Sequence, residues 1–155
     1  MIRAMVSADA AVVAALIRTA FGSITIRLDP PPSALRVSEP DILALLASGG
    51  GAVWDDAGIR GCILWQQRPG GLYLGRLAVD PDWQGRGIAR LLLMAGEEEA
   101  RRIGYVSTLL EVRLALPQNR RLFASAGYVE RAERAHPGFT MPTYAEAEKC
   151  LVEIA

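Results

Sequence analysis

The stretch from Leu74 to Leu92 constrains the fold of this chain more than any other part of the sequence. It combines a strand, a glycine-rich loop and the start of a leucine-rich helix in direct succession. The strand is expected to end at Asp80-Pro81, because proline cannot donate a hydrogen bond to a neighbouring strand. The helix is expected to run from Ile88 to Ile103, so the loop from Gln84 to Ala89 lies at its N-terminus.

Such a loop presents several backbone N–H groups at the positive end of a helix dipole, which favours a phosphate or pyrophosphate. Gly85 and Gly87 let the backbone come close to the anion, and Arg86 and Arg90 can add charged contacts. A Walker A loop would need Lys after its last glycine, where this chain has Ile88. A Rossmann loop would need a small residue at Arg90, so neither of these two phosphate loops fits.

The same string resembles the core motif of the GNAT N-acetyltransferase superfamily, Gln/Arg-x-x-Gly-x-Gly/Ala after a strand that ends in Val-Asp-Pro. The matching residues are Gln84, Gly87 and Ala89, preceded by the strand end Leu77 to Pro81. The resemblance extends through Leu109 to Arg113 and Leu122 to Tyr128. It covers the chain well from Leu72 to Tyr128, whereas the N-terminal helices agree with the family only in their order.

The order of elements predicts an α+β fold in one domain, residues 1–155, which the resemblance makes an acyl-CoA N-acyltransferase domain. Antiparallel hairpins come first and strand–helix–strand crossovers follow. The resemblance implies a mixed, mostly antiparallel sheet of about seven strands, with helices on both faces and a splayed parallel pair at its centre. The further elements expected are helices over residues 7–21, 41–47 and 119–125 and strands over residues 2–6, 52–54, 59–67, 72–79, 108–114, 128–134 and 149–154.

By the resemblance, the cofactor is acetyl-CoA, which serves as the acyl donor to an amine in a ternary complex, with no metal. The backbone of Leu77, Ala78 and Val79 is expected to pair with the pantetheine arm, and one of their N–H groups to stabilise the oxyanion. Residues Gly85 to Arg90 are expected to hold the pyrophosphate. The complete set implied for the cofactor is Leu77, Ala78, Val79, Gln84, Gly85, Arg86, Gly87, Ile88, Ala89, Arg90, Asn119 and Phe123.

Glu111 is the candidate general base, because it is expected at the start of a strand beside the thioester and an attacking amine must lose a proton. The alternative is a structural carboxylate paired with Arg113 or Arg76. Phe123 occupies the position where the family often has a tyrosine as general acid, and phenylalanine cannot donate a proton. The leaving thiolate is then protonated by water, by Tyr128 or by Tyr144.

Three further features bear on the acceptor side and on the last helix. Asn119 is interpreted as a helix N-cap after Pro117 that also contacts CoA. His136 lies in a loop between the last strands, where the family often builds its acceptor site; a proton relay and a solvent-exposed loop residue are both open. The proline-rich segment from Asp29 to Arg36 is the other candidate wall of that site, or a brace of the fold.

Composition narrows the class of partner. Lys plus Arg and Asp plus Glu each number 17, which argues against nucleic acid as the main partner. No apolar run approaches the ~20 residues that cross a bilayer. The N-terminus, Met1 to Met5, lacks the apolar stretch of a signal peptide, so a cytoplasmic protein without a membrane partner is expected. Cys62 and Cys150 are expected to be reduced and buried, and with His136 as the single histidine no metal is implied.

The sequence leaves the amine acceptor open between a small molecule and a peptide. Two other functions stay in view. A non-catalytic acyl-CoA sensor or interaction module would explain Phe123, and a protein N-terminal acetyltransferase is suggested by the Leu-Glu-Val-Arg setting of Glu111. Related domains often pair through their sheets, so a homodimer is a further possibility.

Overall fold

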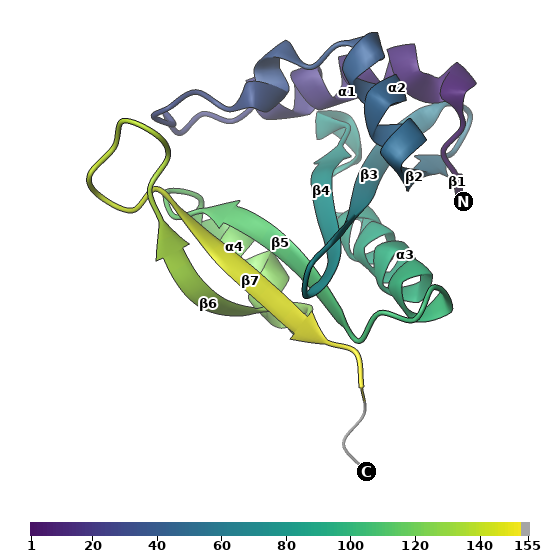
Figure 1. The fold of residues 1–155 in the computed structure, drawn as a ribbon. Coiled ribbons are helices and arrows are strands. Elements are labelled where there is room, and N and C mark those ends of the chain that lie inside the picture. The colour runs from purple at the N-terminus through teal and green to yellow at the C-terminus, as the bar shows by residue number, and fades with distance from the viewer. Residues whose placement is uncertain (153–155) are drawn as a thin grey trace.

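The computed structural model describes residues 1–152, which form one open sheet with helices on both of its faces (Figure 1). Within this range the sheet has seven strands in the order β1-β2-β3-β4-β5-β7-β6. The pair β4–β5 is parallel and the others are antiparallel. The strands are β1 (Ile2–Ala4), β2 (Gly49–Asp55), β3 (Ile59–Arg68), β4 (Gly71–Val79), β5 (Ser107–Arg113), β6 (Val129–Arg134) and β7 (Tyr144–Cys150). The α+β class and the mixed, mostly antiparallel sheet are therefore confirmed.

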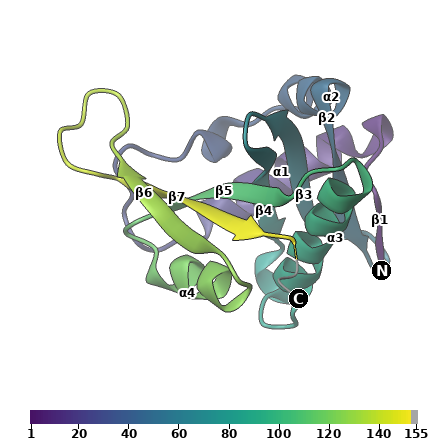
Figure 2. The same cartoon turned by 60° about the horizontal axis from the view of Figure 1, so that its bottom comes forward.

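The helices divide the core into two layers, one on each face of the sheet (Figure 2). Helices α1 (Ala10–Gly22) and α2 (Glu39–Ser48) pack on one face, against side chains such as Val53 and Leu64. Helix α3 (Ile88–Arg102) packs on the other face with Ile63 and Leu72, and α4 (Pro117–Ser125) adds Phe123 to that cluster. Single 3-10 turns occur at Ser7–Asp9, Ser33–Arg36 and Pro81–Trp83. The turn at Ser33–Arg36 lies in the proline-rich segment between α1 and α2.

Strand β2 begins three residues earlier than the sequence predicted, at Gly49 instead of Ala52. The glycines are there because the neighbouring strand passes very close. A Cβ at Gly49 would lie 2.0 Å from the Trp65 carbonyl oxygen, and one at Gly51 would lie 2.6 Å from the Ile63 oxygen. These glycines therefore belong to the sheet and do not merely end the preceding helix.

The central parallel strands separate soon after they meet. Strands β4 and β5 pair only at Leu72↔Thr108 and Tyr73↔Leu109. Further along β4 a bulge lies opposite Ile63, where the register to β3 shifts, and Arg76 takes a φ of 52°. Bulges bend the strand that carries them. After the last pair, Tyr73↔Leu109, β4 and β5 diverge. This confirms the splayed pair at the centre of the sheet.

The last strand was placed wrongly by the sequence. It is β7, Tyr144–Cys150, and not residues 149–154, whose final two positions lie outside the described residues. Its inward residues are the small Ala145 and Ala147, alternating with half-buried glutamates, so the strand lacks the apolar run that marked residues 149–154. Cys150 at its end is exposed, contrary to expectation, whereas Cys62 is buried. None of the helices within residues 1–152 is long and apolar enough to cross a membrane.

Candidate active site

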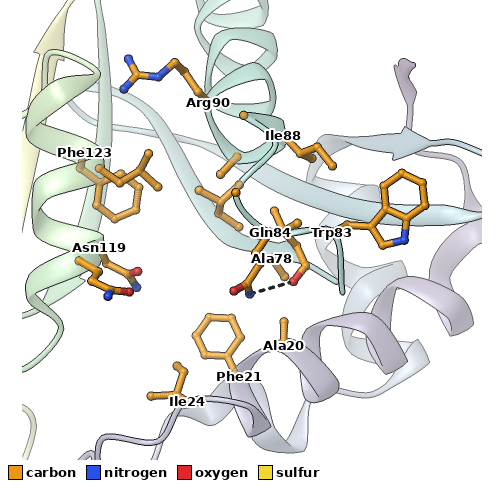
Figure 3. Close-up of a pocket in the computed structure, with 17 residues that line it drawn as sticks. Ala20, Phe21, Ile24, Ala78, Trp83, Gln84, Ile88, Arg90, Asn119 and Phe123 are labelled. Atoms are coloured by element: carbon orange, nitrogen blue, oxygen red, sulfur yellow. Dashed lines mark hydrogen bonds between the residues drawn. The ribbon is translucent and has the colours of Figure 1, made fainter. Parts of the chain in front are cut away.

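A cleft of about 380 Å³ opens where β4 diverges from β5, between the C-terminal end of α1, the start of α3 and helix α4 (Figure 3). Phe21 and Ile24 approach it from one side and Asn119 and Phe123 from another. Its floor is the end of β4. The residues that line it are Ala20, Phe21, Ile24, Leu77, Ala78, Val79, Trp83, Gln84, Gly85, Gly87, Ile88, Ala89, Arg90, Gln118, Asn119, Leu122 and Phe123.

The glycine loop forms one end of this cleft. Gly85 and Gly87 have φ values of 79° and 80°, in the left-handed region that favours glycine. Gly87 is the N-cap of α3, and its carbonyl oxygen accepts the first helical bond from Leu91 N–H at 3.2 Å. The N–H groups of the first helical turn have no acceptor within their own helix. The N–H groups of this turn lie at the positive end of the helix dipole of α3, which has 15 residues. The loop before it has no side chain at Gly85 and Gly87.

The end of β4 offers one free strand edge to the cleft. Ala78 and Val79 pair with Cys62 and Gly61 of β3 on one side. On the other side, among the residues that the structure describes, the β4–β5 ladder stops at Tyr73. An unpaired strand edge binds an extended chain that carries alternating amide donors and acceptors.

Eleven of the twelve residues expected to bind the cofactor line this one cleft. Arg86 does not line it: its guanidinium stacks on the Trp83 ring at 4.4 Å. Arg90 lines the cleft and donates to the Ser125 hydroxyl at 2.6 Å, which ties α3 to α4. Asn119 lines the cleft but is not the N-cap of its helix. The cap is Leu116, because Pro117 is preorganised for the first helical position, so Asn119 lies inside the first turn.

A second cavity of about 220 Å³ adjoins the first on the other side of the β4 end. The two share Phe21, Leu77, Asn119 and Phe123 in their walls. The second cavity is bounded by β4, β5 and β7, by the loop after α1 and by the loop between β6 and β7, both visible at the upper left of Figure 1. Its polar lining side chains are Ser33, Tyr73, Arg76, Glu111, Arg113, Asn119, His136 and Tyr144.

Glu111 faces this second cavity, although it does not stand at the start of its strand as predicted. It is the fifth of seven residues of β5, beyond the point where β4 has turned away. Its nearest cation is Arg68, at 3.8 Å, and not Arg113 or Arg76. The Arg68 guanidinium also stacks on the Tyr73 ring at 3.6 Å. Burial and the nearby Glu111 charge raise the pKa of Tyr73 to about 12, so this hydroxyl stays protonated at neutral pH.

The candidate proton donors lie in different places. The Tyr128 hydroxyl is buried in the core, 2.8 Å from the Thr108 hydroxyl, and donates to Glu97 at 3.0 Å, so it does not face either cavity. Tyr144 lines the second cavity and packs on the His136 ring, with centroids 4.8 Å apart. Burial and the positive charge of Arg113 lower the pKa of His136, whose Nδ1 bonds the Thr143 hydroxyl.

Sequence reasoning missed residues that only the fold brings to the site. Phe21 lies near the end of α1 and Ile24 just after it, both far from the glycine loop in sequence, and nothing local marks them as lining residues. Tyr73 lies over Gly75, where a Cβ would stand 2.9 Å from the tyrosine ring. A glycine inside a strand often marks a bulge or a close approach, so Gly75 was the local signal at this place. Within residues 1–152, no group of three His, Cys, Asp or Glu side chains is arranged to hold a metal ion.

These features place the protein in a structural class. Its members have an open mixed sheet whose central parallel strands separate beside a glycine loop at the N-terminus of a helix. Residues 16–128 match the model of the acetyltransferase (GNAT) family. The match spans most of the chain, and this protein therefore belongs to the GNAT acetyltransferase family. Membership of that family implies acetyl transfer from acetyl-CoA. A comparison with curated protein sequences found no significant match.

Solved structures similar to this chain share its fold over nearly their whole length. The PaiA N-acetyltransferase of Thermoplasma acidophilum in complex with coenzyme A has a TM-score of 0.81 at 16% identity, over 97% of this chain and 98% of that one. YncA of Salmonella typhimurium with its cofactor acetyl-CoA has a TM-score of 0.74 at 22% identity, over 100% and 95%. A ribosomal-protein-alanine N-acetyltransferase of Brucella melitensis has a TM-score of 0.75 at 19% identity, over 97% and 99%. At these identities the likeness concerns the fold.

Proposed function

We propose that this protein is an N-acetyltransferase that moves the acetyl group of acetyl-CoA directly to a primary amine of a small molecule or peptide, in a ternary complex. The observation that carries the proposal is the meeting of two cavities at the splayed end of β4, one beside the glycine loop and one beside Glu111. One cavity suits the donor and the other the acceptor. The shared wall at Leu77, Asn119 and Phe123 is where the thioester and the amine would meet.

The donor would be held by backbone groups at both of its polar parts. The pyrophosphate would lie against the N–H groups of residues 85–90, at the helix dipole of α3, with charge from Arg90. The amide groups of the pantetheine arm would continue the sheet along the free edge of Leu77, Ala78 and Val79. Gln84 also contributes to this corner, since its amide donates to the Val79 carbonyl oxygen at 3.4 Å. Arg86, stacked on Trp83 outside the cleft, would add only a long-range positive charge.

The transfer itself needs a neutral amine and a stabilised oxyanion. One N–H among Leu77, Ala78 and Val79 would donate to the thioester oxygen as the amine nitrogen attacks the carbonyl carbon. Glu111 would take the proton of the amine, directly or through water. The C–S bond then breaks and the thiolate leaves. Phe123 at the junction has no proton to give, so the thiolate would be protonated by water or by Tyr144.

Two other functions remain in competition. A non-catalytic acyl-CoA sensor is favoured by Phe123, the apolar residue at the junction where the family often has a tyrosine. A protein N-terminal acetyltransferase is favoured by the setting of Glu111 and by the similar fold of the Brucella enzyme. Acetylation of lysine-free peptides at their first residue would distinguish the last function from small-amine chemistry.

The decisive experiment is a calorimetric titration of the protein with acetyl-CoA, followed by assay of free CoA thiol across a panel of amines and peptides. Binding together with amine-dependent thiol release would support the proposal. Tight binding with no release across the panel would favour the sensor. No binding of acetyl-CoA would overturn the assignment of the first cleft.

A further inference from the structure

The second cavity contains an arginine that has no partner among the residues described by the structure. Arg113 is half-buried in its wall, and among residues 1–152 its guanidinium has no hydrogen bond or ion pair. Burial lowers the pKa of Arg113, and the negative charge of Asp29, in the exposed loop after α1, opposes this effect. A partly buried guanidinium has lost some of its hydration, and without an ion-pair partner this cost is not offset. Such a group favours binding of an anion.

The neighbouring cations on this face of the sheet are already engaged. Within the described part of the chain, Arg68 pairs with Glu111 at 3.8 Å, and Arg134 pairs with Glu146 of β7 at 3.2 Å. Arg131 pairs with Glu148 at 3.7 Å. Among these four arginines, Arg113 is therefore the one whose charge is left for a ligand.

A second guanidinium stands across the cavity. Arg76 lines the same cavity from β4, where its Nη2 donates to the Ser33 hydroxyl at 3.1 Å. A guanidinium has five N–H donors, so this one bond leaves others available. Arg76 and Arg113 thus place positive charge on two sides of one small cavity.

The position of Glu111 relative to Arg113 suggests the shape of the ligand. The two residues are two positions apart on β5, so their side chains leave the same face of the sheet, with Cα atoms about 7 Å apart. Arg113 attracts an anion, and Glu111, whose contact with Arg68 is long at 3.8 Å, attracts a cation. This pairing suits a molecule that carries an amine and an oxyanion only a few bonds apart.

We propose that the acceptor is a small amino carboxylic acid, such as a free amino acid, whose amine lies at Glu111 and whose carboxylate is bound by Arg113 with help from Arg76. The inference rests on the proposed function. The cavity, about 220 Å³, is below the ~300–1,000 Å³ of sites for drug-sized ligands, which agrees with a small acceptor. The N-terminus of a peptide carries no carboxylate next to its amine, so this acceptor class argues against protein N-termini.

The test compares matched acceptors in the acetyl-CoA thiol-release assay. The proteinogenic L-amino acids are assayed beside their α-carboxamides and the amines that lack the carboxyl group, such as L-leucine, L-leucinamide and 3-methylbutylamine. For the preferred side chain we expect kcat/KM for the acid to exceed that for the amide by about 10- to 100-fold, the value of one charge-assisted pair. Because the amides differ in amine basicity, each pair is compared at equal concentration of neutral amine.

Variants then assign the preference to the arginine. Arg113→Gln should lower kcat/KM for the acid by about 10- to 100-fold and leave the amide unchanged, and Arg113→Lys should restore part of the loss. Arg134→Gln is the matched control, since this arginine lies on the edge strand β6, beyond β7, and pairs with Glu146 outside the cavity. It should leave the preference unchanged.

The outcomes separate this inference from the function on which it rests. Turnover of amines with equal rates for acids and amides, or an equal loss for both in Arg113→Gln, would overturn the inference and leave the acetyltransferase intact. If acetyl-CoA binds but nothing is turned over, amino acids are titrated into the CoA-loaded protein, and the absence of Arg113-dependent binding overturns it. Failure to bind acetyl-CoA at all would instead overturn the proposed function.

Discussion

Gly87 shows how one residue can serve both the backbone and a ligand. Its φ of 80° is in the left-handed region, and nothing lies within 4 Å of the position where a Cβ would stand. The space beside it belongs to the first cleft. A side chain at this position would therefore project into the proposed pyrophosphate site without striking the core.

We expect Gly87→Trp to weaken CoA binding by more than about 100-fold, equivalent to about 3 kcal/mol, because the indole occupies the anion cradle. The fold should survive at a cost of about 1–2 kcal/mol for the left-handed backbone. Gly104→Trp is the control: Gly104 has a φ of 95° and equally open surroundings, but it lies at the far end of α3. Calorimetry with CoA and urea denaturation measure both effects, and equal CoA affinity in the two variants would contradict the placement.

Glu111 is the residue whose proposed chemistry is easiest to isolate. If it accepts the proton of the amine, Glu111→Gln should lower kcat/KM by about 100-fold or more near neutral pH. The loss should shrink as pH approaches the pKa of the acceptor amine, because a neutral amine no longer has to be deprotonated before it attacks. Glu146→Gln is the control, since Glu146 is the cross-strand partner of Glu111 on β7 and pairs with Arg134. A loss that does not change with pH would indicate that Glu111 only positions Arg68.

At the scale of elements, a buried polar network joins α3 to the strands that carry the acceptor cavity. Glu97 of α3 is 3% exposed and accepts hydrogen bonds from the Tyr128 hydroxyl at 3.0 Å and from Lys149 of β7 at 2.8 Å. Thr108 of β5 lies 2.8 Å from the same hydroxyl. The network thus fixes β5 and β7 against α3 at the end of the sheet opposite the splay.

Lys149→Met should destabilise the protein by about 2–3 kcal/mol, because it leaves the Glu97 carboxylate buried without its cation. Adding Glu97→Gln should recover more than half of the loss, since the amide oxygen can still accept from Tyr128. Arg101→Met, which breaks an exposed pair with Glu98, should cost less than about 1 kcal/mol. Urea denaturation of the four proteins measures these values, and an equal cost for Lys149 and Arg101 would show that the buried network contributes nothing.

At the scale of the whole molecule, the buried thiol of Cys62 should make stability depend on alkaline pH. Burial raises the pKa of Cys62 to about 12, whereas the thiol of an unfolded chain ionises near about 8.5. Above that pH the unfolded state has lost a proton that the folded state keeps. The contribution of Cys62 to stability is therefore complete below about pH 8.5 and is lost progressively as pH rises toward 12, at about 1.4 kcal/mol per pH unit.

We expect the free energy of unfolding to fall less steeply between about pH 9 and 10 in Cys62→Ala than in the native sequence, by about 1 kcal/mol per pH unit. Tyr73 and Tyr128 also lose protons on unfolding as pH approaches about 10, but both are present in the variant and in the native protein, so the difference between the two slopes isolates Cys62. Cys150→Ala is the control variant, because Cys150 is exposed. Equal slopes for Cys62→Ala and the native protein would show that the thiol is solvated in the fold.

The features that the sequence determined by itself are those that depend on neighbours along the chain. The loop from Gly85 to Gly87 requires left-handed backbone, which glycine alone adopts without strain, and both positions take it. The helix after Gly87 and the end of the strand before Pro81 follow from the same local chemistry. The predictions of the family and of the α+β class rested on these local features, and the structure and the family match confirm both.

The tertiary structure decided what depends on residues distant in sequence. The start of β2 at Gly49 reflects the approach of Trp65, and β7 exists because Ala145 and Ala147 fit against the core beside β5. The second cavity, the pairing of Glu111 with Arg68 and the unpaired Arg113 likewise arise only when β4 and β5 separate. Whether a charged side chain is paired or free depends on which elements pack beside it. These contacts join residues distant in sequence, so no local sequence pattern predicts them.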